Sequence, residues 1–194
     1  MRRAIFSRKT AETEVEVELT LDGVGYASLD IPIPFLKHML ELATFHGRFD
    51  LSLKAKGDIE VDYHHTVEDI GIALGKAFDI ALGERKSIRR YGFSIIPMDE
   101  ALSSVIIDMC FRPNLVYKVN KQLGFIKDFD TSLIKEFFKA FSDNARCTLH
   151  IIVHYGENTH HIIESIFKAF GKAIYQATRK EDLKNSYPST KGIL

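Results

Sequence analysis

The dipeptide His-His occurs twice in this sequence, each time with a glutamate three positions after its second histidine. Residues 64–68 read HHTVE, and residues 160–164 read HHIIE. When residues 64–81 are laid over residues 160–177, nine positions carry the same amino acid. Imidazole nitrogens and carboxylate oxygens are common ligands of divalent cations. The repeat therefore indicates a metal-binding pattern that was duplicated together with the segment that carries it.

The spacing within each copy suits an α-helix. Residues four positions apart lie on the same face of a helix, so the first histidine and the glutamate of each copy can bind one ion. Adjacent helical residues point about 100° apart. We therefore expect the second histidines, His65 and His161, to bind a second ion that belongs to the other half of the chain or to a neighbouring subunit.

Each copy also has a candidate ligand upstream. His38 lies 26 residues before His64, and Glu136 lies 24 residues before His160. Because the set contains only nitrogen and carboxylate ligands, it argues against a structural zinc site and fits Mn, Fe, Co, Ni or Zn in a catalytic site. The predicted metal ligands are enough for two sites of about four ligands each: His38, His64, His65, Glu68, Glu136, His160, His161 and Glu164.

Hydrophobic periodicity predicts the elements that position these residues. In the first half, the expected strands are 14–20, then 24–31 returning antiparallel after a turn at Asp22-Gly23, then 49–53, and then 59–61 after a turn at Gly57-Asp58. A helix opened by Pro32 and Pro34 and another over about 65–82 complete this half. In the second half, the expected strands lie near 92–97, 102–109, 115–119 and 147–153, and the helices at about 131–143 and 160–180.

Two copies of one plan predict an α+β fold. Each copy is expected to be a mixed β-sheet with two helices packed on one face, so the chain is an internally duplicated unit. The polar stretch 83–90 is the natural junction. Residues 1–90 would form the first half, and residues 91–194 the second half with a C-terminal substrate-binding tail, together making one compact domain.

Composition excludes several kinds of partner. Lys+Arg and Asp+Glu both total 26 in the 194 residues, so no strong overall field attracts nucleic acid or a membrane surface. No apolar run approaches the roughly 20 residues of a membrane span, and the first nine residues lack the apolar core of a secretion signal. The two cysteines, Cys110 and Cys147, fit buried, reduced thiols. We expect a cytoplasmic protein that binds neither nucleic acid nor membrane.

Several basic and hydroxyl side chains could form a local anion pocket despite the zero net charge. Arg90 and Arg112 can pair bidentately with phosphate oxygens. Lys168 and Lys191 would add point charges, and Ser189 a hydroxyl donor. This combination favours a small phosphate-bearing substrate.

With these residues together, the chain resembles the imidazoleglycerol-phosphate dehydratase family over about residues 8–194. The resemblance is carried by five segments, which are FLKHML at 35–40, DYHHTVED at 62–69, PMDEAL at 97–102, HHIIE at 160–164 and PSTKG at 188–192. Three positions depart from the family pattern. Lys37 replaces an acidic residue, Tyr63 a common aspartate, and Phe111 the usual glycine before Arg-Pro.

The resemblance implies a lyase of histidine biosynthesis that converts imidazole glycerol phosphate to imidazole acetol phosphate. It implies two Mn²⁺ per active site bridged by the deprotonated imidazole ring, and 24 subunits built from trimers with metal sites between subunits. The metal ligands are those named above, with Glu136 at a position where many members have histidine. The implied substrate contacts are Glu12, His46, Arg90, Arg112, Lys168, Ser189 and Lys191. Glu12, Glu164 and Glu68 are the candidates for proton transfer.

Two other functions use the same residue types. A dinuclear metallohydrolase acting on a small phosphate ester would use a metal-bound hydroxide as nucleophile. A non-catalytic protein could use the same ligands only to hold an assembly together. Analysis of the products distinguishes these, because a hydrolase adds water across a bond, whereas a dehydratase removes water and keeps the phosphate.

Overall fold

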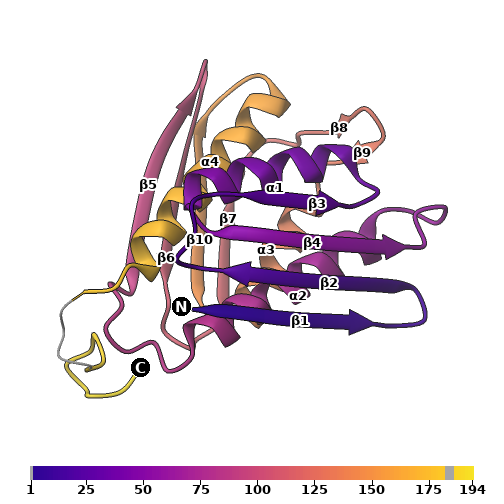
Figure 1. The fold of residues 1–194 in the computed structure, drawn as a ribbon. Coiled ribbons are helices and arrows are strands. Elements are labelled where there is room, and N and C mark those ends of the chain that lie inside the picture. Colours follow the sequence, from indigo (N-terminus) through magenta and orange to yellow (C-terminus); the bar gives the residue numbers. More distant parts are fainter. Residues whose placement is uncertain (1, 182–185) are drawn as a thin grey trace.

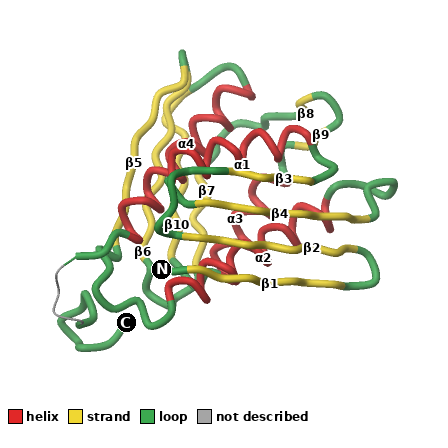
Figure 2. Tube along the Cα trace, viewed as in Figure 1, coloured by secondary structure: helices red, strands yellow, loops and turns green. Residues whose placement is uncertain are grey.

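The chain folds into two four-stranded sheets with its long helices packed between them (Figures 1 and 2). This computed structural model describes residues 2–181 and 186–194; Met1 and residues 182–185, which fall inside the two expected halves, lie outside the described residues. The first half contains β1 (Arg3–Lys9), β2 (Thr13–Thr20), β3 (Ala27–Asp30), α1 (Pro34–Gly47), β4 (Asp50–Gly57) and α2 (His64–Leu82). The second contains β5 (Tyr91–Met98), β6 (Ala101–Asp108), β7 (Asn114–Lys118), β8 (Phe125–Ile126), β9 (Phe129–Asp130), α3 (Leu133–Asn144), β10 (Thr148–Tyr155) and α4 (Thr159–Thr178).

The two sheets have the same topology. Their strand orders are β1-β2-β4-β3 and β5-β6-β10-β7. In each sheet, the first three strands of this order pair antiparallel, and the last joins its neighbour in parallel through a crossover helix. This repeated pattern confirms the predicted α+β fold built from a duplicated mixed sheet. The exact division at residue 90 stays a prediction.

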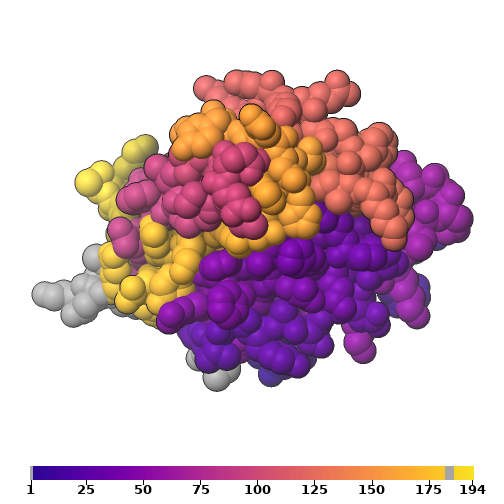
Figure 3. All heavy atoms as spheres, turned by 90° about the horizontal axis from the view of Figure 1, so that it is seen from above, coloured from indigo at the N-terminus to yellow at the C-terminus, as the bar shows by residue number. Residues whose placement is uncertain are grey.

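Alternation of side chains explains why each sheet covers the helices on one face only. In β2, Val15, Val17 and Leu19 are buried, while the intervening Glu16 and Glu18 are exposed. A strand with this period places one row of side chains in the core and the other in water. The helices α1 and α2 lie against the first sheet, and α3 and α4 against the second. In the space-filling view, the orange atoms of the second half lie directly against the purple atoms of the first (Figure 3).

Two predicted strands of the first half were wrong. The expected antiparallel strand at 24–31 is shorter, Ala27–Asp30, and pairs in parallel with β4. Because α1 follows β3 directly, it acts as the crossover that brings the next strand alongside in the same direction. The expected strand at 59–61 is a turn.

Two features were missed from the sequence. The strand β1 has only Ala4 fully buried, since it lies at the edge of its sheet and shows weak alternation. The hairpin of β8 and β9 consists of two-residue strands, which are too short to show a period.

Within the described residues, no helix is both long and apolar enough to cross a membrane. Cys110 and Cys147 are free and buried, as predicted.

Glycines at equivalent positions of the duplicated helices allow close helix packing. A β-carbon at Gly75 in α2 would lie 2.7 Å from the carbonyl oxygen of Phe141 in α3. A β-carbon at Gly171 in α4 would lie 2.5 Å from the carbonyl oxygen of Ala43 in α1. Because real β-carbons do not approach backbone this closely, both positions require glycine. The duplicated glycine thus sets the distance between α2 and α3 and between α1 and α4.

We predict that Gly171→Ala destabilises the protein by about 1–3 kcal/mol, because the added methyl group pushes α1 from α4. Helix propensity alone predicts the opposite sign, a gain of up to about 1 kcal/mol. The free energy of unfolding from urea titration decides between the two. A variant as stable as the parent would show that the helices are not held at this distance.

Candidate metal and anion sites

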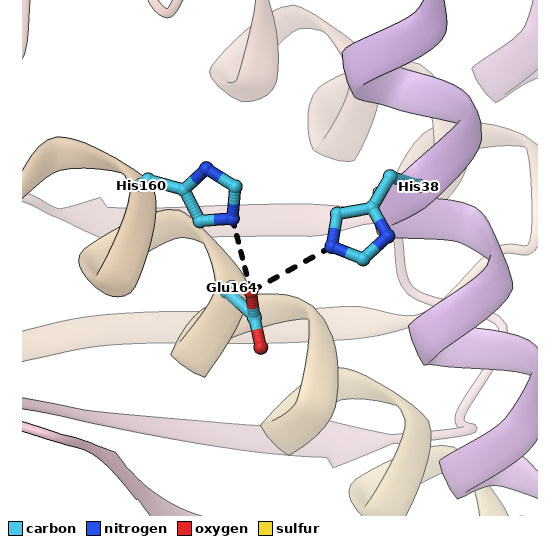
Figure 4. Close-up of side chains that lie close together, drawn as sticks. All are labelled: His38, His160 and Glu164. Atoms are coloured by element: carbon cyan, nitrogen blue, oxygen red, sulfur yellow. Dashed lines mark hydrogen bonds and ion pairs between the residues drawn. The ribbon is translucent and has the colours of Figure 1, made fainter.

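Three predicted metal ligands meet where α1 crosses α4 (Figure 4). Glu164 Oε2 lies 3.0 Å from His160 Nε2 and 3.7 Å from His38 Nε2. The nearest ligand atoms of the three residues all lie within 4.8 Å of one another. Two imidazole nitrogens and one carboxylate oxygen make a donor set suited to a divalent transition metal. We call these three residues the α1–α4 cluster.

The carboxylate of Glu164 is buried and has a lowered pKa, which favours the binding of a cation. The side chain of Glu164 is only 10% exposed, and its Oε1 lies 2.6 Å from Lys168 Nζ. Burial disfavours the charged carboxylate, but Lys168 and His160 outweigh it and hold the pKa of Glu164 below its usual value. One oxygen of the carboxylate therefore binds Lys168, while the other faces the two histidines.

His46, a predicted substrate contact, lies near the same part of α4. It is in the last turn of α1. Burial lowers its pKa, and the positive charges of Lys172 and Lys168 lower it further. His46 and Lys168 thus lie beside the α1–α4 cluster.

Hydrogen bonds at the helix starts hold both histidine pairs in the first turn. The N-cap residue of α4, Asn158, accepts hydrogen bonds from the backbone N–H groups of His160 at 2.8 Å and His161 at 3.3 Å. In α2, Asp62 accepts from the backbone N–H of His64 at 2.7 Å. Such caps satisfy backbone donors that a helix leaves unpaired. The His-His dipeptides begin helices, as the sequence predicted.

The second histidines face other carboxylates. His65 Nδ1 lies 2.9 Å from Asp58 Oδ2 and 3.5 Å from Glu12 Oε2, and these three residues form a second group of possible ligands. His161 Nδ1 lies 2.7 Å from Glu100 Oε2. This hydrogen bond, together with those that Glu100 accepts from backbone N–H groups, lowers the pKa of Glu100 to about 2.

The first half does not reproduce the α1–α4 cluster. By the duplication, Glu136 on α3 should meet His64 and Glu68 on α2. In the part of the chain that the structure describes, these three residues do not form a group of close ligand atoms. Glu68 is exposed and Glu136 is half-buried, and both their roles stay predictions.

Four predicted substrate contacts line one cavity of about 650 Å³ beside the C-terminal tail: Arg90, Arg112, Ser189 and Lys191. Asp108, which sequence reasoning missed, holds the arginines. It accepts from Arg90 Nε at 2.7 Å and from Arg90 Nη2 at 3.1 Å, and lies 3.6 Å from Arg112 Nη2. Arg90 Nη1 also donates to the carbonyl of Pro188 at 3.0 Å, which ties the tail to the cavity. The cavity can bind an anion.

The C-terminal tail, which lines the cavity, lies near the last turn of α4, at the opposite end from the start of the helix (Figure 1), which carries His160. The backbone N–H of Arg90 donates to the carbonyl of Ala177 at 2.9 Å. Ala177 follows His160 by 17 residues, 177 minus 160, which at 1.5 Å per residue is about 25 Å along the helix. The predicted anion contacts therefore divide, with Lys168 near the histidines and the arginines far from them.

Two departures from the family pattern have structural partners. Phe111 has a left-handed backbone, with φ of 59°, a conformation that favours the glycine it replaces. Its ring lies 4.0 Å from the guanidinium carbon of Arg85 and 4.4 Å from that of Arg146. These cation–π contacts offset part of the backbone strain. Tyr63 stacks on Phe129 of β9 with ring centroids 6.3 Å apart.

We predict that Asp108→Asn destabilises the protein by about 3 kcal/mol, because it leaves the buried guanidinium of Arg90 without its counter-charge. Arg112→Ala is the matched control. Arg112 is 64% exposed and more distant from the same carboxylate, so its loss should cost about 1 kcal/mol or less. Urea unfolding measures both. Equal effects would mean that Asp108 does not hold Arg90 as described.

Comparison with known proteins identifies the family. The family model described as imidazoleglycerol-phosphate dehydratase matches residues 31–174. Proteins of that name from Thermodesulfovibrio yellowstonii and Bacillus subtilis are 54% and 50% identical over the full length of both chains.

Two solved structures of that enzyme share the fold. The Staphylococcus aureus structure has a TM-score of 0.83 at 37% identity and covers 92% of this chain and 100% of its own. The Pyrococcus furiosus structure, in complex with (S)-C348, has a TM-score of 0.85 at 36% identity and covers 97% of this chain and 100% of its own. None of these four proteins is named as a hydrolase. The chain belongs to the imidazoleglycerol-phosphate dehydratase family, which comprises lyases of histidine biosynthesis.

Proposed function

We propose that this protein dehydrates imidazole glycerol phosphate to imidazole acetol phosphate in the cytoplasm, with two Mn²⁺ per active site. The α1–α4 cluster is the observation that carries the metal dependence. We further propose a homo-oligomer, 24 subunits built from trimers, in which metal sites form between subunits. The proposed function involves neither a nucleic acid nor a membrane.

The donors of the cluster suit Mn²⁺. Imidazole nitrogen and carboxylate oxygen are acceptable ligands for this ion, and Glu164 is ionised and directed at His38 and His160. When bound, the cations supply positive charge that stabilises the deprotonated imidazole ring of the substrate. His64, His65, Glu68, Glu136 and His161 would provide the remaining ligands.

The cavity beside the C-terminal tail fits the phosphate of the substrate. Arg90 is already oriented by Asp108 and Pro188, so little side-chain freedom is lost on binding. Arg112, Ser189 and Lys191 would add further donors at the same cavity. Holding the phosphate fixes the glycerol chain for reaction at the ring end.

The length of α4 supports a site shared between subunits. Imidazole and phosphate are joined by only three carbon atoms in this substrate, so it cannot span about 25 Å along α4 between the cavity and the cluster of one chain. The cluster of one subunit must therefore work with the cavity of another. Lys168 and His46, beside the cluster, would contact the same substrate from the first subunit.

We assign proton transfer to Glu12 among the three candidate carboxylates. Both oxygens of Glu164 are engaged, one by Lys168 and the other by His160. Glu12 lies in the turn between β1 and β2, is 56% exposed, and lies 3.5 Å from His65. A carboxylate that is free to move its proton next to a metal ligand can serve as general base. Glu68, which is exposed on α2, is the alternative candidate for proton transfer.

Removal of metal should abolish the reaction. Protein treated with a chelator and then freed of it should produce no acetol phosphate, because the ring then lacks the charge that stabilises it. Added Mn²⁺ should restore the activity. The test measures product formation alongside metal content. Full turnover in protein shown to be metal-free would refute the proposal.

Mixed oligomers test the shared site. His160→Ala and Lys191→Ala chains should each be inactive alone, yet oligomers reassembled from equal amounts should regain about a quarter of the sites, since each intact site draws its two halves from different chains. His160→Ala mixed with His38→Ala is the matched control. Both changes lie in one cluster, so no activity should return. If the first mixture also stays inactive, the two halves do not come from different subunits.

A further inference from the structure

In the second histidine of each pair, His65 or His161, the Nδ1 atom is hydrogen-bonded to a carboxylate. Asp58 Oδ2 lies 2.9 Å from His65 Nδ1, and Glu100 Oε2 lies 2.7 Å from His161 Nδ1. Neither carboxylate belongs to a His-His pattern or to the predicted ligands. The same ring atom is engaged in both halves of the duplicated chain, which indicates a shared requirement rather than two chance surface contacts.

Glu100 is itself fixed by the backbone. It lies in the turn between β5 and β6, where its Oε1 accepts from the backbone N–H groups of Asn158 at 2.7 Å and Glu157 at 3.2 Å. Its other oxygen binds His161. One carboxylate therefore joins the hairpin turn, the start of α4 and an imidazole ring. Such a group is positioned before any ion arrives.

A carboxylate at Nδ1 decides which nitrogen can bind an ion. Neutral imidazole has one N–H group and one lone pair, and the hydrogen bond made by one nitrogen sets the role of the other. With the proton kept at Nδ1 by the carboxylate, the lone pair lies on Nε2. Carboxylates that hydrogen-bond to a metal-binding histidine without binding the metal themselves commonly orient the ring and raise its basicity.

We propose that Asp58 and Glu100 are positioning residues that keep the proton of His65 and His161 on Nδ1, so that both rings present Nε2 to a divalent cation. The inference rests on the proposed metal dependence. It gives Asp58 a role beside the ion, in place of the direct-ligand role that its grouping with Glu12 and His65 also allows, and gives Glu100 the matching role in the second half.

The two halves use different segments for this purpose, and the difference leaves Glu12 free. The turns between β1 and β2 and between β5 and β6 are equivalent in the duplicated topology, and each carries a glutamate, Glu12 and Glu100. In the second half, the turn glutamate holds the ring. In the first half, Asp58 after β4 takes that place, and Glu12 lies further from His65 Nδ1, at 3.5 Å. The turn of the second half also carries Asp99, which is 70% exposed and lies 3.8 Å from His161 Nε2, so each half keeps one exposed turn carboxylate beside its histidine.

The tautomer can be measured in metal-free protein. With histidine labelled by ¹⁵N, NMR should show His65 and His161 protonated at Nδ1 in the parent. Asp58→Ala and Glu100→Ala should each shift their own ring toward protonation at Nε2. If the rings keep the Nδ1 proton in these variants, the proposal is overturned.

Mn²⁺ affinity provides the second measurement. Each Ala variant should bind the ion about 10–100-fold more weakly in calorimetric titration. This is the loss typical of removing the hydrogen-bond partner of a metal ligand. The more conservative Asp58→Asn and Glu100→Gln keep an acceptor oxygen and should retain the tautomer, with a smaller loss, so they serve if an Ala variant does not fold. Glu157→Gln is the control, because it removes an exposed charge from the same loop without a partner ring; it should change neither readout.

The two proposals fail in different ways. A parent protein that binds no Mn²⁺ would refute the metal-dependent function, whereas the tautomer in metal-free protein still tests Asp58 and Glu100. Ala variants that bind Mn²⁺ as tightly as a competent parent would overturn the positioning role alone.

Discussion

The close packing of α1 on α4 is the constraint on which the α1–α4 cluster depends. His38 reaches His160 and Glu164 only because Gly171 lets the backbone of α1 approach α4. The two sheets hold this contact from outside by covering the helices. The buried carboxylate of Glu164 then finds Lys168 on one side and the two histidines on the other. A separation larger by one methyl group would disturb the packing and the donor set together.

The second constraint is the length of α4. It places histidines at its first turn and the arginine-rich cavity near its last turn. Under the proposed function, a single folded chain would hold two half-sites rather than one whole site, because a small substrate cannot span the helix. Assembly of subunits would then be part of catalysis, since it would bring one half-site to the other. The zero net charge also fits this arrangement, because strong like charge would oppose association of identical chains.

Duplication gave the protein two similar halves that were then used differently. The histidine pairs, their helix starts and the packing glycines match between halves. Around these matching parts the carboxylates differ. Glu164 joins His38 and His160, whereas its counterpart Glu68 is exposed. Glu100 holds a ring, whereas its counterpart Glu12 leaves that task to Asp58. Under the proposed function, this divergence would give a site in which the α1–α4 cluster holds a cation and Glu12 serves as base.

Sequence patterns alone determined the duplicated α+β plan, the histidine pairs at helix starts and the grouping of His160 with Glu164, because alternation, helical spacing and capping are local properties of a chain. They also pointed to four residues of the anion cavity. Tertiary structure decided the rest. It set the parallel pairing of β3, the hydrogen bonds of Asp58, Glu100 and Asp108, and the separation of Lys168 from Arg90. These depend on which segments distant in sequence are packed together, and a local pattern carries no record of that packing.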